Sequence, residues 1–131
     1  QRPLMQGDLF MQNCLIVAFG GAVGTVCRYL IGLLPVEAQS GFPLKTLFIN
    51  ILGAFVIGLI AALSAKNAAL SPKLVLLLKV GVCGGFTTFS TFAYETGDLL
   101  QNGSTAVALS YVLLSVTLGV LAVFAAQLLV R

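Results

Sequence analysis

Hydrophobic residues fill four long runs of this chain, and short polar stretches containing proline, glycine and asparagine separate them. A helix needs roughly 20 consecutive, mostly apolar residues to cross the hydrocarbon core of a bilayer. Each run is long enough, so the pattern predicts four transmembrane helices joined by short turns. The predicted helices are Cys14–Leu34, Leu44–Ala65, Leu74–Thr96 and Ala106–Val130.

A glycine-containing polar segment interrupts the third run, where residues 84–92 read GGFTTFSTF. From Lys73 to Asp98 the chain would be about 39 Å long as one straight helix, more than the hydrocarbon needs. Irregular backbone is tolerated at membrane depth only inside protein or beside a polar cavity, and broken transmembrane helices are typical of ion and substrate sites. We therefore expect the third helix to break at Gly84 and Gly85, and we expect transport rather than catalysis.

The composition indicates a membrane protein and excludes most enzyme chemistry. Of the 131 residues, 59% are hydrophobic and 8% are charged. We predict an all-α integral membrane protein, with a polar N-terminal tail at residues 1–13 and a single four-helix membrane domain at residues 14–131. The chain has no histidine and only three cysteines, without CxxC pairing, so we expect no enzyme and no His or Cys metal site. The net charge of +3 is too small to indicate nucleic-acid binding.

Basic residues lie mainly on one side of the predicted bundle. Four spans place the N-terminus, the second connection and the C-terminus on one side of the membrane. On the opposite side, Lys45 is the basic residue close to a span. The terminal side holds Arg2, Lys66, Lys73 and Arg131. The positive-inside rule therefore favours cytoplasmic termini in a multi-pass protein of the cell inner membrane, although the bias is modest.

The first predicted helix carries Arg28 on the same face as Gly20 and Gly24. This glycine spacing is typical of close helix packing. A buried arginine costs at least ~2.5–3.5 kcal/mol. Two interpretations stay open: the side chain reaches the membrane interface, or its guanidinium draws anions into a vestibule.

Thr46, Asn50 and Gly53 form a polar and small-residue stripe on the second helix. An intramembrane asparagine taken alone is best explained as a hydrogen bond between helices. Its amide NH2 group can also donate to an anion, so both roles stay open for Asn50.

Phe89 and Phe92 follow the double glycine, with Ser90 and Thr91 between them. A phenyl ring has a positive edge that an anion can approach. Packing would explain the two phenylalanines alone, but the hydroxyls and glycines beside them favour an ion path. Thr91 also lies one turn before Glu95, where its hydroxyl could hold the carboxylate.

The fourth predicted helix carries Tyr111, Ser115 and Gly119 on one face. This hydroxyl-bearing face could line a polar track. Serine in membrane helices also bonds to its own helix, so the signal is weak by itself.

The segment GGFTTFSTF closely resembles the signature of the Fluc (CrcB) family of fluoride channels. The resemblance covers roughly Leu15 to Leu129, including the glycine-rich first helix with Arg28 and the segment from Thr46 to Asn50. It implies a fluoride-selective channel that passively exports fluoride from the cytoplasm. It also implies a dual-topology homodimer in the lipid bilayer, with antiparallel subunits and two pores along their interface.

The resemblance implies a role for each matched residue. Backbone carbonyls of Gly84 and Thr87 from both subunits would hold a central structural sodium ion, and Arg28 and Thr46 would belong to a vestibule. Gly119 stands where some members of the family carry a serine, so one polar contact would be missing. The fluoride pathway would comprise Asn50, Phe89, Ser90, Thr91, Phe92, Glu95, Tyr111 and Ser115.

Two other functions compete with the channel. A small proton-coupled multidrug or guanidinium exporter also has four short helices, but it needs a membrane-embedded carboxylate, and only Glu95 is a candidate. A non-transporting subunit would use the glycines and hydroxyls for helix packing alone. Anion flux that is indifferent to a proton gradient would distinguish the channel from both.

Overall fold

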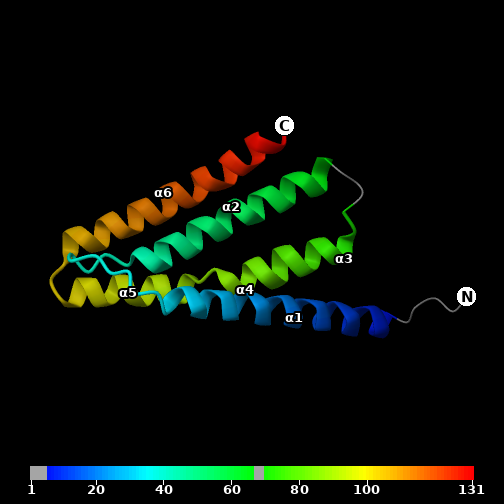
Figure 1. The fold of residues 1–131 in the computed structure, drawn as a ribbon, viewed down its shortest axis with the longest axis horizontal. Coiled ribbons are helices and arrows are strands. Elements are labelled where there is room, and N and C mark those ends of the chain that lie inside the picture. The colour runs from blue at the N-terminus through cyan, green and yellow to red at the C-terminus, as the bar shows by residue number, and fades with distance from the viewer. Residues whose placement is uncertain (1–5, 67–69) are drawn as a thin grey trace, which may run out of the picture.

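The computed structural model describes residues 6–66 and 70–131, and every regular element in these ranges is helical (Figure 1). Four helical stretches are long and apolar enough to cross a membrane, which confirms the four predicted spans. The third span, Pro72–Gln101, is built from four consecutive pieces. The elements are α1 (Gln6–Gly32), α2 (Leu44–Lys66), α3 (Pro72–Val75), η1 (Leu76–Cys83), α4 (Gly84–Phe86), α5 (Phe89–Gln101) and α6 (Thr105–Val130).

The four spans form two packed pairs. The helix α2 packs along α6, and α1 packs along η1 and α4. The two pairs lie close together near α5 and spread apart towards the end where α1 begins and α6 ends (Figure 1). Few side chains in the described residues are buried, so a single subunit leaves most of its apolar surface to lipid or to another protein.

Small residues allow α1 to approach the third span closely. A Cβ atom added to Gly20 would lie 2.6 Å from the carbonyl oxygen of Leu77, and one added to Gly24 would overlap the carbonyl oxygen of Val82. On the other side of the contact, a Cβ on Gly85 would overlap the carbonyl oxygen of Gly21. The predicted role of the Gly20 and Gly24 face in close helix packing is therefore confirmed.

The first helix begins earlier than its hydrophobic run does. The expected polar tail covered residues 1–13, but the chain is already helical from Gln6. Asp8 lies in the first turn, where a negative charge is favourable, and Gln12 accepts a hydrogen bond from the Lys73 ammonium. Helix formation needs only satisfied backbone groups, so α1 extends beyond its apolar part. Arg2 lies outside the described residues.

Candidate ion site

The third span breaks at Thr87 and Thr88, three residues later than Gly84, where the break was expected to start. Gly84 and Gly85 are helical, in α4, so the expected position was wrong. Thr87 (φ −79°, ψ 156°) and Thr88 (φ −147°, ψ 116°) are both extended, a conformation that suits β-branched residues. The glycine at position 85 instead lets the backbone of α1 approach, as the contact with Gly21 shows.

Two side chains stabilise the broken backbone. The hydroxyl of Thr88 accepts a hydrogen bond from the Thr91 N–H (3.2 Å) and so caps the start of α5. Asn50 on α2 binds the same residue through both ends of its amide: Nδ2 donates to the Thr88 carbonyl (3.0 Å), and Oδ1 accepts from the Thr88 N–H (2.8 Å). Asn50 therefore links two spans, and one N–H of its NH2 group is left over to donate elsewhere.

Glu95 is held by residues from two other spans. Its carboxylate accepts a hydrogen bond from the Thr46 hydroxyl (3.0 Å) and another from the Tyr111 hydroxyl (2.9 Å). The expected partner, Thr91, makes no hydrogen bond to Glu95 within the described residues, and its hydroxyl oxygen accepts one from the Thr88 hydroxyl (3.1 Å). The carboxylate thus joins α2, α5 and α6 at one point.

A row of aromatic rings runs along α5 and α6. Phe92 packs edge-on against Tyr111, with 5.0 Å between ring centroids, and Phe89 lies 5.8 Å from Phe92. Tyr111 is fully buried, whereas Phe89 is 78% exposed. The two phenylalanines are therefore neighbours, and the outer one faces away from the subunit's own core.

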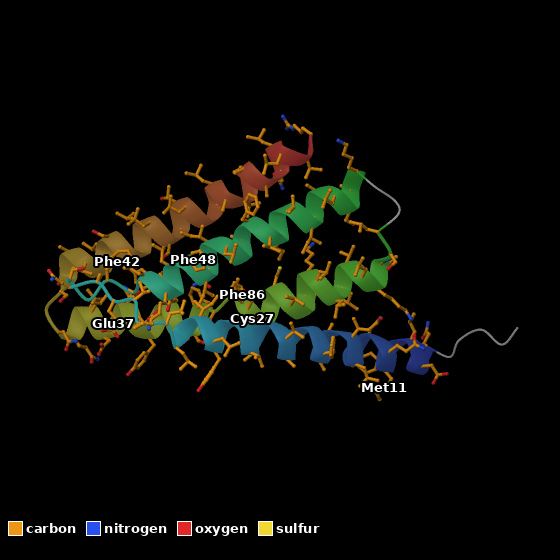
Figure 2. The ribbon with its side chains drawn as sticks, in the orientation of Figure 1. Met11, Cys27, Glu37, Phe42, Phe48 and Phe86 are labelled. Atoms are coloured by element: carbon orange, nitrogen blue, oxygen red, sulfur yellow. The ribbon has the colours of Figure 1, made fainter. Side chains whose placement is uncertain are left out.

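Phe42 is a member of this row that sequence reasoning missed. Its ring packs edge-on against Tyr111 at 5.4 Å, from the connection before α2 (Figure 2). The residue lies in a short polar connection, so hydrophobic periodicity gives no signal for it. Its position beside Pro43, just before a predicted span, is the only indication that the chain folds back there.

An open cavity of about 770 Å³ lies beside these residues, between the end of α1, the connection to α2 and α5. It brings together the two predicted vestibule residues, Arg28 and Thr46, with Thr91 and Glu95 of the predicted pathway. Arg28 Nε donates to the Gly85 carbonyl (3.3 Å), so the guanidinium is turned towards the third span. The vestibule role of Arg28 stays a prediction.

A second cavity of about 260 Å³ lies between α2 and the third span, and its lining includes Asn50, Gly53, Cys83, Gly84 and Thr87. The carbonyls of Gly84 and Thr87 accept no hydrogen bond from residues 6–66 or 70–131. No cluster of three His, Cys, Asp or Glu side chains that could hold a metal exists in the described ranges. Backbone carbonyls are oxygen ligands of the kind that hard cations prefer.

Five predicted pathway residues line neither of these two cavities: Phe89, Ser90, Phe92, Tyr111 and Ser115. Ser90 is exposed at the start of α5. The Ser115 hydroxyl on α6 is buried and has no hydrogen-bond partner within the described residues. The structure thus places Asn50 and Thr91 at the break and joins Phe92 and Glu95 through Tyr111, but it does not bring Ser90 and Ser115 to them.

Comparison with known proteins gives a consistent result. Residues 15–127 match the sequence model of a family described as "CrcB-like protein, Camphor Resistance (CrcB)". A protein of Chlorobaculum tepidum named fluoride-specific ion channel FluC is 44% identical over 123 residues, which is 94% of this chain and 98% of the relative. A protein of the same name from Thermus thermophilus is 49% identical over 115 residues, covering 87% of this chain and 91% of the relative. A third, from Rhizobium meliloti, is 43% identical over 122 residues, or 92% and 98% of the two chains.

Proposed function

This chain belongs to the CrcB family, and we propose that it is a fluoride-selective channel that passively exports fluoride from the cytoplasm. The observation that carries this proposal is the broken third span, where Thr88 and Thr91 line a cavity together with Arg28. The relatives named above are all called fluoride-specific ion channels. The alternative, a proton-coupled exporter, receives no support from them.

Fluoride is small and strongly hydrated, so a conducting path must replace its water with hydrogen-bond donors. The remaining N–H of the Asn50 amide is one such donor, and the hydroxyls of Ser90 and Thr91 are others. The positive ring edges of Phe89 and Phe92 offer the anion weaker contacts than these donors do. These groups can pass the anion along without binding it tightly.

Charged groups near the cavity have separate roles in this proposal. Arg28, beside the Gly85 carbonyl, gives the vestibule a positive charge that attracts anions. Glu95 takes its hydrogen bonds from Thr46 and Tyr111, so it orients two hydroxyl groups at the border of the path. The buried, unpaired hydroxyl of Ser115 is a further group available to the polar track.

The proposed unit is an antiparallel homodimer in the cell inner membrane, with two pores along the interface. A single subunit leaves Phe89 78% exposed and both cavities open, so it does not enclose an ion path. A second copy, inverted in the membrane, would cover these surfaces and would bring Ser90 towards the path. Inverted symmetry of this kind is common in membrane transport.

We include a structural sodium ion at the centre of this dimer. The carbonyls of Gly84 and Thr87 fit the role, because they accept no hydrogen bond within the described residues and hard cations prefer oxygen ligands. When bound, the ion would supply fixed positive charge between the subunits. Asn50 and Thr88 hold the backbone of the break in place beside these carbonyls.

Liposomes that contain the purified protein and potassium fluoride distinguish a channel from a proton-coupled exporter. Valinomycin should start rapid fluoride efflux, measured with a fluoride electrode, and a proton gradient of one pH unit applied with buffer should leave its rate unchanged. Uptake of guanidinium driven by the same gradient, without valinomycin-dependent fluoride efflux, would identify the exporter instead.

A further inference from the structure

Lys79 is a charged residue inside the third span that the site described above does not use. It belongs to η1, seven residues after the span begins at Pro72, and its side chain is exposed. Lys45, Lys66 and Lys73 each donate to an oxygen atom of the protein, whereas Lys79 donates to none within residues 6–66 and 70–131. An ionisable residue within a membrane span is costly and is most often functional, so its surroundings need an explanation.

The direction of Lys79 follows from its neighbours along η1. Leu77 and Gly81 both contact Gly20 of α1: a Cβ atom on Gly20 would lie 2.6 Å from the Leu77 carbonyl oxygen and 2.9 Å from Gly81 Cα. Lys79 lies two residues from each of them, which is roughly half a helical turn. Its side chain therefore leaves η1 on the side that faces away from α1.

The proposed dimer axis passes the third span near Gly84 and Thr87, whose carbonyls would hold the sodium ion. Gly84 is exposed, and a Cβ added to it would meet no atom within 4 Å, so this face is open in the single subunit. Lys79 lies five residues before Gly84, and Phe92 lies five residues after Thr87. The pieces α3, α4 and α5 follow one another along one line (Figure 1). A two-fold axis near Gly84 and Thr87 would therefore bring Lys79 level with the start of the partner subunit's α5.

We propose that Lys79 supplies a positive charge beside the fluoride path whose phenylalanines belong to the partner subunit. This inference rests on the proposed function and on the antiparallel dimer. Each path would then have a second positive charge, from Lys79, in addition to that of Arg28. A positive charge next to a narrow path raises the local concentration of anions and their rate of entry. The competing explanation is a lysine whose ammonium reaches the lipid headgroups and leaves the flux unaffected.

Charge-changing variants of Lys79 test this role in fluoride-loaded liposomes at low ionic strength. Lys79→Gln should reduce fluoride efflux roughly tenfold, the lower end of what electrostatic focusing gives. Lys79→Arg should keep efflux close to that of the wild type, because it retains the charge. Lys73→Gln is the matched control: it removes a lysine from the same span, at the end where Lys73 binds Gln12, and should not change efflux.

Ionic strength provides a second readout that a packing defect would not produce. An impermeant salt at about 1 M shortens the Debye length to about 3 Å, so the difference between wild type and Lys79→Gln should shrink. Efflux from Lys79→Gln that equals the wild-type rate at low ionic strength would overturn the proposal. Absence of fluoride efflux from the wild type itself would instead refute the channel function.

Chemical modification keeps the test decisive if Lys79→Gln does not fold. Lys79→Cys is made in a chain whose exposed Cys14 and Cys27 are alanine, while the buried Cys83 is retained, and the chain without Lys79→Cys serves as the control. After reconstitution, a cationic thiosulfonate reagent should raise fluoride efflux and an anionic reagent of similar size should lower it. Equal effects of the two reagents, or no effect of either, would contradict a role for the charge.

Discussion

Asn50 shows how one side chain can serve both structure and conduction. Its amide holds the Thr88 N–H and carbonyl at the break, at 2.8 and 3.0 Å, and still has one N–H to donate. The two sequence interpretations of Asn50, a link between helices and an anion donor, are therefore compatible. The first is observed directly, and the second belongs to the proposed function.

Asn50→Asp should impair both the break and fluoride conduction. The carboxylate has no donor for the Thr88 carbonyl and adds negative charge to an anion path, so we expect at least a tenfold loss of efflux. A destabilisation of about 1 kcal/mol should accompany it, because the half-buried Thr88 carbonyl loses its partner. Efflux and thermal unfolding are measured together, with Ser110→Ala, at an exposed site on α6, as the control. Normal conduction in Asn50→Asp would leave Asn50 with the structural role alone.

Phe89→Ile and Phe92→Ile separately test the aromatic edges. Both variants keep an apolar side chain but remove the positive ring edge, so fluoride efflux should fall several-fold while the dimer persists on size-exclusion chromatography. Phe19→Ile on α1, where the ring is 66% exposed, is a control of similar exposure. Wild-type efflux in both variants would remove the phenylalanines from the mechanism.

At the scale of elements, hydropathy predicts the spans well and the course of the backbone within them poorly. The four spans, their order and the presence of a break in the third were all predictable, because apolar length decides membrane insertion. The π-helical geometry of η1 and the position of the break were not, because they depend on contacts between spans. Gly85 is needed for packing against Gly21, and Asn50 binds Thr88, so the break occurs at the threonines.

The same limit applies to the candidate site. The residue types at the site were recognisable from GGFTTFSTF and from the polar stripe on α2. The partners of Glu95 were not, because Thr46 and Tyr111 lie on other spans, far from it in sequence. Phe42 and Lys79 were overlooked for different reasons: the first lies in a connection, and the second within a run that reads as apolar.

Close packing between α1 and the third span gives a prediction at this scale. Gly24→Ala would place a methyl group against the Val82 carbonyl oxygen and 2.7 Å from the Phe86 nitrogen. We expect a destabilisation of about 1–3 kcal/mol, typical of overpacking. Gly119→Ala on α6 is the matched control, since its Cβ would meet nothing within 4 Å. Equal melting temperatures for the two variants in detergent would contradict the claim that close packing of α1 against the third span stabilises the protein.

At the scale of the whole molecule, lysines near the span ends donate hydrogen bonds to carbonyls at helix C-termini on both sides of the bundle. Lys45 donates to the carbonyls of Gly32 (3.0 Å) and Leu34 (3.2 Å) at the end of α1, and Lys66 donates to the Val130 carbonyl (2.7 Å) at the end of α6. A cation at a helix C-terminus is favourable. On the terminal side, Lys66 therefore has a structural role besides any effect on orientation.

The proposed sodium ion makes the stability of the dimer depend on sodium. A ligand that binds only the folded protein stabilises it by about 2.7 kcal/mol at a concentration 100 times its Kd. Replacing sodium with N-methylglucamine during purification should therefore lower the melting temperature of the dimer, and adding sodium back should restore it. Choline, another large cation, should behave like N-methylglucamine. A melting temperature independent of sodium would remove the ion from the proposal.

The central claim is that the assembled protein conducts fluoride selectively, and efflux of two halides tests it most directly. Proteoliposomes loaded with potassium fluoride or potassium chloride are treated with valinomycin, and ion-selective electrodes follow each anion. We predict rapid fluoride efflux and chloride efflux no faster than from protein-free liposomes. Equal release of both halides, or no release of fluoride from properly inserted protein, would contradict the account.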